Sequence, residues 1–162
     1  MLNGHKTIKY SPILLILVLN AILLIGCSSY PAQHAYTTSR PHHSKIIGIA
    51  KAQLGKPYHY GGKSPKTGFD CSGLINYSYE KAGLSVPRTT RQLYHFAKPV
   101  KRNHLKAGDL VFFRINRKKI SHVGLYLGNN RFIHAPSGSK KVNIANLNNK
   151  YWRIRFTRGG RI

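Results

Sequence analysis

The spacing of apolar residues changes after the third predicted helix, and this change restricts the fold class most. Apolar residues recur at helical spacing in residues 44–55, 71–82 and 89–97, where Ser44 and Thr89 are candidate N-caps. The remainder consists of short β-rich runs separated by Gly, Asn, Ser and Pro. They predict strands at 109–114, 122–127, 131–135, 141–145 and 151–157, with a hairpin turn at 128–130. Helices followed by an antiparallel sheet indicate an α+β domain.

The N-terminus carries the features of a secretion signal. Basic residues between His5 and Lys9 precede an apolar run over residues 12–25, which ends at Gly26 and Cys27. This end resembles a bacterial lipobox, so we expect residues 1–26 to be removed and Cys27 to be acylated. Ser28 resembles the residue that follows the cysteine in outer-membrane lipoproteins of Gram-negative bacteria. An uncleaved anchor or a signal without lipidation are the alternatives.

The polar, proline-containing residues 27–43 predict a lipidated flexible tether, and residues 44–162 a single folded domain. We therefore expect a protein anchored in the cell envelope, at the periplasmic face of the outer membrane.

The chain is strongly basic, with 27 Lys and Arg against 3 Asp and Glu and a formal charge of +24. Such a surface attracts anionic membranes, envelope polymers or nucleic acid, and charge alone does not rank them. The secretion signal favours envelope polymers, so we do not expect nucleic acid to be a partner.

Cys71 is the candidate nucleophile. If Cys27 carries lipid, Cys71 has no cysteine to pair with in an oxidising compartment. It stands at the first turn of a predicted helix, where free N–H groups and the helix dipole favour a thiolate and predict a lowered pKa. The alternative is a buried cysteine that acts as a small apolar residue.

Two histidines are candidate partners for this thiol. His122 begins one predicted strand, and His134 lies on the next strand of the predicted hairpin. If their side chains share a face, they form a nucleophile, base and orienting residue in series with Cys71. A lone histidine in either position is more often structural.

Six blocks in order resemble the NlpC family of papain-like cell-wall cysteine peptidases. These blocks are Tyr58-His59-Tyr60-Gly61-Gly62, Phe69-Asp70-Cys71-Ser72-Gly73, Pro87-Arg88-Thr89-Thr90, Ala107-Gly108-Asp109-Leu110-Val111-Phe112-Phe113, Ser121-His122-Val123-Gly124 and Phe132-Ile133-His134-Ala135. The resemblance covers the whole domain from residue 44 onward and implies a papain-like fold, with N-terminal helices packed on an antiparallel sheet.

The resemblance also implies roles for individual residues. Cys71 would be the nucleophile, His122 the general base and His134 the third polar residue. Tyr58 would help to bind the oxyanion. Ser72 and Asp70 would line the site, although Asp70 could equally cap the helix.

Such enzymes hydrolyse amide bonds in the peptide stems of peptidoglycan, and the family also contains amidases and acyltransferases. We expect a monomer that binds peptidoglycan, is attached to the membrane by its lipid and uses no cofactor. Two other classes remain open: a cationic envelope-polymer or nucleic-acid binding protein on a peptidase scaffold, and a zinc site built from Cys71 and the two histidines.

Overall fold

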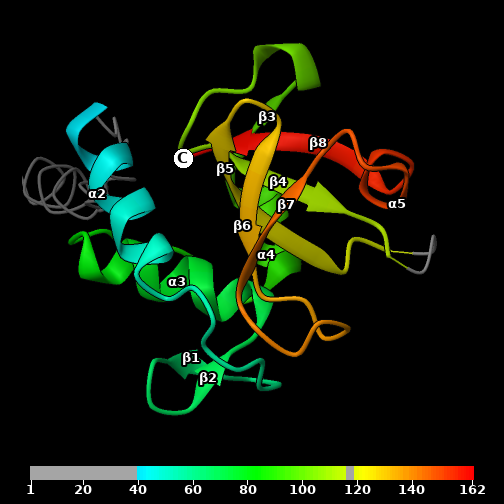
Figure 1. The fold of residues 1–162 in the computed structure, drawn as a ribbon. Coiled ribbons are helices and arrows are strands. Elements are labelled where there is room, and N and C mark those ends of the chain that lie inside the picture. The colour runs from blue at the N-terminus through cyan, green and yellow to red at the C-terminus, as the bar shows by residue number, and fades with distance from the viewer. Residues whose placement is uncertain (1–39, 116–118) are drawn as a thin grey trace, which may run out of the picture. The chain divides into compact units, whose positions relative to one another are not determined.

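The computed structural model describes residues 40–115 and 119–162, whose arrangement is shown in Figure 1. The predicted signal peptide, Cys27 and most of the predicted tether lie outside these residues. Within the described ranges, no helix is both long and apolar enough to cross a membrane.

Three helices precede the main sheet, as the apolar spacing predicts. They are α2 (Arg40–Lys51), α3 (Cys71–Lys81) and α4 (Thr90–Phe96). The predicted cap at Thr89 is confirmed, because its hydroxyl accepts a bond from the Gln92 N–H while the Gln92 side chain accepts from the Thr89 N–H.

The predicted start of the first helix at Ser44 is wrong. The helix begins four residues earlier, so residues 40–43, predicted as the end of the tether, are helical and Ser44 is not a cap. Pro41 is compatible with this earlier start, because a proline in the first helical turn removes an N–H that has no intrahelical partner.

A six-stranded antiparallel sheet follows and confirms the α+β class. Its strands are β3 (Lys98–Val100), β4 (Leu110–Phe113), β5 (His122–Gly128), β6 (Arg131–His134), β7 (Asn143–Asn146) and β8 (Phe156–Arg161). Their spatial order is β3-β8-β4-β5-β6-β7, so the C-terminal strand lies between β3 and β4. The predicted hairpin joins β5 to β6, with positive φ angles at Asn129 and Asn130.

Several short elements are absent from the sequence prediction. A two-residue pair, β1 (Lys63–Ser64) and β2 (Gly68–Phe69), forms its own small sheet before α3. Strand β3 and the 3₁₀ turn η1 (Arg102–His104) lie between α4 and β4. These segments are too short for the spacing of their apolar residues to indicate a helix or a strand.

The strand predicted at residues 151–157 is wrong in its first half. Residues Lys150–Arg153 form a single helical turn, α5, and β8 starts only at Phe156. Asn149 caps this turn, because its Oδ1 accepts a bond from the Tyr151 N–H at 2.9 Å. Aromatic residues favour strands in general, and here the preceding cap selects a helical turn instead.

The two faces of the sheet bury different clusters of apolar side chains. Leu110 and Phe112 of β4 belong to the cluster shared with α2 and α3. Val111 and Phe113 belong to the opposite cluster, which Trp152 of α5 packs against. Helix α3 therefore approaches the sheet from one side and α5 covers the other side.

Candidate active site

Asp70 fixes the start of helix α3, at which Cys71 is the first residue. The Asp70 carboxylate accepts a bond of 2.6 Å from the Gly73 N–H and acts as the N-cap. Gly73 lies so close to the preceding loop that an added Cβ would be 2.0 Å from the Gly62 carbonyl oxygen. The cap and this close approach together hold the first turn of α3, and with it Cys71, against the loop.

Arg88 holds this cap from the segment before α4. Its guanidinium donates to both Asp70 carboxylate oxygens, at 3.1 and 2.8 Å, and to Ser72 Oγ at 3.0 Å. Burial alone would raise the pKa of Asp70, but the bonds from Arg88 and the Gly73 N–H lower it below its usual value. Asp70 is therefore a charged structural cap, and the Ser72 hydroxyl is already engaged by Arg88.

The Cys71 thiol lies at the junction of three elements. Its Sγ is 3.4 Å from the Thr90 hydroxyl of α4, and it receives backbone N–H bonds from Ser72 and from Val123, the residue after His122. Burial nevertheless raises the pKa of the thiol above its ordinary value, and the Asp70 charge adds to that rise. The lowered pKa predicted from the helix N-terminus is therefore wrong, since desolvation outweighs the donors. Cys71 therefore rests as a thiol near pH 7.

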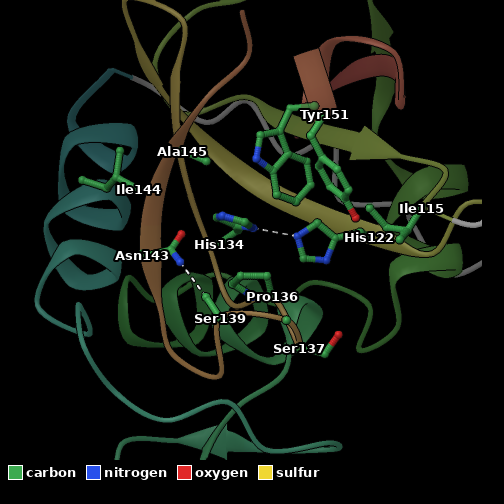
Figure 2. A pocket seen from close by; sticks show the side chains of 12 residues that line it. Ile115, His122, His134, Pro136, Ser137, Ser139, Asn143, Ile144, Ala145 and Tyr151 are labelled. Atoms are coloured by element: carbon green, nitrogen blue, oxygen red, sulfur yellow. Dashed lines mark hydrogen bonds between the residues drawn. The ribbon is translucent and has the colours of Figure 1, made fainter. Parts of the chain in front are cut away.

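His122 and His134 form a directly bonded pair. Nε2 of His122 lies 2.9 Å from Nδ1 of His134, both side chains are buried, and Figure 2 shows the bond as a dashed line. Burial lowers the pKa of His122 to about 4 and that of His134 to about 3, so both rings are neutral near pH 7. If the His122 Nε2–H donates to His134, its Nδ1 is unprotonated and available as a base.

The hairpin register explains why the two rings meet. Leu125 of β5 pairs with Ile133 of β6, and continuing this register places Gly124 opposite His134. A Cβ on Gly124 would be 3.3 Å from the His134 Cβ and 2.6 Å from the Phe132 ring. The missing side chain leaves room above β5, and the expectation that the two histidines share a face is confirmed.

Trp152 is a site residue that sequence reasoning missed. Its ring stacks on His122 with centroids 5.5 Å apart and planes 27° apart, and it meets His134 edge to face at 4.7 Å. It shields the ring pair on the sheet face opposite α3. Since Trp152 is the chain's only tryptophan and lies in a polar stretch, it was visible in sequence, but only the helical turn α5 directs it to the histidines.

Tyr58 lies in the loop between α2 and β1 and shares a cavity with the thiol. It lines a cavity of about 440 Å³ together with Cys71, Asp70, Ser72 and Arg88. Burial, and then the charges of Cys71 and Asp70, raise the pKa of the Tyr58 phenol, so it stays protonated and can donate a hydrogen bond.

A second cavity, of about 520 Å³, is lined by both histidines. It is lined further by Ser137, Ser139, Asn143, Ile144, Tyr151 and Trp152. Cys71 and the two histidines therefore line different cavities of similar volume. In the described residues, no group of three or more His, Cys, Asp or Glu side chains is arranged to hold a metal ion.

Thr90 offers a direct test of how the thiol is tuned. Its hydroxyl lowers the pKa of Cys71 by bonding to the sulfur, so Thr90→Val should move the pH midpoint of iodoacetamide alkylation upward. The matched control is Thr67→Val, since Thr67 bonds to Ser64 beside the β1–β2 turn instead. An unchanged or lowered midpoint in Thr90→Val would show that the contact does not tune the thiol.

Comparison with known proteins agrees with this geometry. The chain matches the NlpC/P60 family over residues 55–161. It is 45% identical over 137 residues to murein DD-endopeptidase MepH of Escherichia coli, covering 78% of this chain and 51% of that protein. It is 42% identical over 120 residues to murein DD-endopeptidase MepS/murein LD-carboxypeptidase of the same species, covering 74% and 62%. The chain thus spans about half to three-fifths of the length of these relatives.

Solved structures give the same result. A lipoprotein-like NLP/P60 family protein from Staphylococcus aureus superimposes with a TM-score of 0.70 at 34% identity, over 77% of this chain and 42% of the other. The peptidoglycan hydrolase RipB of Mycobacterium tuberculosis gives a TM-score of 0.65 at 31% identity, over 76% and 65%. The fold is therefore papain-like, and the chain belongs to the NlpC/P60 family.

Proposed function

We propose that this chain is a cysteine-type peptidoglycan endopeptidase that cleaves amide bonds in stem peptides through a thioester. One observation carries the proposal: Cys71 lies beside the start of β5, while His122 on that strand is bonded at 2.9 Å to His134. A nucleophile, a neutral base and an orienting residue are thereby held by three different elements. The relatives named as murein DD-endopeptidases support peptidoglycan as the substrate.

In the proposed acylation step, Cys71 Sγ attacks the amide carbonyl carbon as its proton passes to His122 Nδ1. The Tyr58 O–H and a backbone N–H at the start of α3 are the donors to the oxyanion. Collapse breaks the C–N bond, and the proton on His122 goes to the leaving amine. Asp70 and Ser72 act indirectly, by holding the first turn of α3 and Arg88 in place.

Deacylation repeats these steps with water. His122 takes a proton from the water that attacks the thioester, and the carboxylic acid product leaves as the thiol is reprotonated. His134 keeps the base in one tautomer and orientation throughout. Amidase or acyltransferase activity would use the same steps with a different acyl group or acceptor.

Digestion of purified peptidoglycan tests the proposal and identifies the bond. Wall treated with the protein and then with a muramidase should give uncross-linked or shortened muropeptides, recognised by mass, and iodoacetamide should prevent their formation. Muropeptides whose stems remain cross-linked and uncut would contradict the proposal, as would activity that survives alkylation of Cys71.

We further propose that Cys27 is the acylated first residue of the mature protein and attaches it to the envelope membrane. The support is the basic and apolar N-terminal sequence that ends at Gly26 and Cys27. Mass spectrometry of the membrane-extracted protein should give an N-terminal peptide that starts at Cys27 and carries acyl chains. A peptide that starts at Met1, or an unmodified Cys27, would contradict it.

The strongly basic surface is a second feature that affects which molecules the protein binds. All three acidic residues lie in the described part of the chain, and Asp70 and Asp109 are each paired with an arginine. Of these three acidic residues, only Glu80 makes no ion pair with the described part of the chain. We propose that the excess of cations attracts anionic envelope polymers and acidic stem peptides, which concentrates the enzyme at its substrate.

A further inference from the structure

The bonded histidine pair can hold its protons in two ways, and only one of them leaves a base. Burial keeps both rings neutral near pH 7, so each ring carries one N–H, and the 2.9 Å contact between His122 Nε2 and His134 Nδ1 has one donor. If His122 donates, its Nδ1 is free to take a proton. If His134 donates, the proton of His122 is on Nδ1 and the ring cannot act as the base.

The residue in the third position does not settle this choice by itself. A carboxylate in that position could only accept, and it would fix the tautomer of its neighbour. A neutral His134 can donate or accept through Nδ1, depending on whether its proton is on Nδ1 or Nε2. The direction of the bond between the two rings must therefore come from a group beyond His134.

Asn143 is the next side chain in the series. It lies directly opposite His134 in the register of β6 and β7, and its side chain hydrogen-bonds to that ring. An amide can accept through Oδ1 or donate through Nδ2, so the result depends on which atom faces the ring. Nδ2 donates to Ser139 Oγ at 2.7 Å, and Figure 2 shows this bond as a dashed line. The bond to His134 is therefore made by Oδ1, which accepts from Nε2–H.

Ser139 fixes the orientation of this amide. Its hydroxyl donates to the Lys141 carbonyl at 3.2 Å. A hydroxyl has one hydrogen and a carbonyl oxygen only accepts, so Ser139 can only accept from Asn143. Rotating the Asn143 amide by 180° would place two acceptors against each other.

Backbone pairing holds the last acceptor of the series in place. The Tyr58 N–H donates to the Lys140 carbonyl at 2.7 Å, and the Val142 N–H donates to the Lys56 carbonyl at 2.8 Å. Lys141 lies between these two bonds, so its carbonyl belongs to a fixed stretch of main chain. The series therefore ends on an acceptor that cannot change its role.

We propose that Asn143 and Ser139 are positioning residues that set the tautomer of the base through a directed series of hydrogen bonds. Ser139 donates to the Lys141 carbonyl, and Asn143 donates to Ser139. His134 Nε2–H then donates to Asn143 Oδ1, and His122 Nε2–H donates to His134 Nδ1. His122 Nδ1 is left without a proton and can take one from the thiol. The inference rests on the proposed function, in which His122 is the base.

Nitrogen NMR of protein labelled at its histidines tests the series without any substrate. Ring nitrogens with and without a proton resonate far apart, and the two rings are assigned from the signals lost in His122→Gln and His134→Gln. In the wild type, both rings should carry their proton on Nε2. Asn143→Leu removes the acceptor at similar volume and should distribute the His122 proton over both ring nitrogens. A wild-type His122 protonated on Nδ1, or an unchanged tautomer in Asn143→Leu, would overturn the proposal.

Kinetics on a defined stem peptide give the second measurement. Asn143→Leu should lower kcat about tenfold, the change in tautomer ratio expected when one hydrogen bond is lost. KM should change less than twofold, because the wrong tautomer reduces the fraction of competent enzyme and removes no contact with substrate. The matched control is Asn146→Leu on the same strand, where the exposed Asn146 pairs with Arg131, and its kcat should stay within twofold. A raised KM at unchanged kcat in Asn143→Leu would show a substrate contact instead and overturn the proposal.

A double-mutant cycle tests the order of the series. Ser139→Ala allows the Asn143 amide to turn and should lower kcat about threefold, less than Asn143→Leu, because the bond to His134 remains possible. In the Asn143→Leu background, Ser139→Ala should have no further effect, since no amide is left to orient. Losses that multiply in the double variant would show that the two side chains act separately, which would overturn the series.

The spectroscopic result separates this inference from the proposed function. If the protein cleaves no peptidoglycan but its tautomers are as expected and change in Asn143→Leu, the proposed function fails and the directed series stands. If the protein cleaves peptidoglycan and the tautomers do not respond to Asn143→Leu, the series fails and the proposed function stands.

Discussion

Replacement of Cys71 by serine is expected to abolish turnover, with a loss on the order of 10⁴-fold or more. The reason lies in the base as much as in the nucleophile. Burial lowers the pKa of His122 to about 4, so the neutral ring is a weak proton acceptor. A thiol, even one whose pKa is raised, gives up its proton far more readily than a hydroxyl does. Serine would therefore not be deprotonated at a useful rate.

Hydrolysis of a defined stem peptide measures this effect, with thermal unfolding as the control for folding. Cys71→Ala should be equally inactive, and both variants should keep the wild-type Tm within a few degrees, because the side chain is only partly buried. Turnover by Cys71→Ser near the wild-type rate would remove Cys71 from the role of nucleophile.

The local features that could be predicted from the sequence are those whose cause is itself local. The Thr89 cap and its Gln92 partner lie three residues apart, and the turn at Asn129 and Asn130 is encoded by the residues that occupy it. The sharing of a face by His122 and His134 follows from that turn, because a hairpin fixes which residues oppose one another.

What the sequence could not predict depends on tertiary contact. The aromatic residues at 151 and 152 indicate a strand, and only the Asn149 cap and the packing of Trp152 on the ring pair explain the helical turn. The sequence allows Asp70 as a helix cap, but Arg88 stands 18 residues away, and nothing in this spacing predicts that Arg88 holds the cap.

The direction of the Cys71 pKa shift is the clearest case of this kind. A helix N-terminus lowers a thiol pKa wherever it occurs, and the first position of α3 is visible in the sequence. Desolvation depends on what α4 and β5 place around the sulfur, and it reverses the sign. A candidate nucleophile can thus be proposed from the sequence, while its resting protonation state cannot be predicted from it.

The histidine pair should give a graded result. His122→Ala should lower kcat by roughly 10³- to 10⁴-fold. Without the imidazole, no group protonates the leaving amine, and no group takes the proton from the attacking water. In the proposed mechanism His134 only accepts the bond from His122 Nε2, 2.9 Å from its Nδ1, so His134→Gln or His134→Asn, whose amide oxygen can accept the same bond, should lose much less than His134→Ala. The Ala variant also leaves a void beside Trp152, so its Tm must be measured alongside kcat.

The expected order of activity, from highest to lowest, is wild type, His134→Gln, His134→Ala, His122→Ala. A greater loss in His134→Ala than in His122→Ala, at comparable Tm, would mean that the second ring takes part in proton transfer itself and that the assigned roles are wrong.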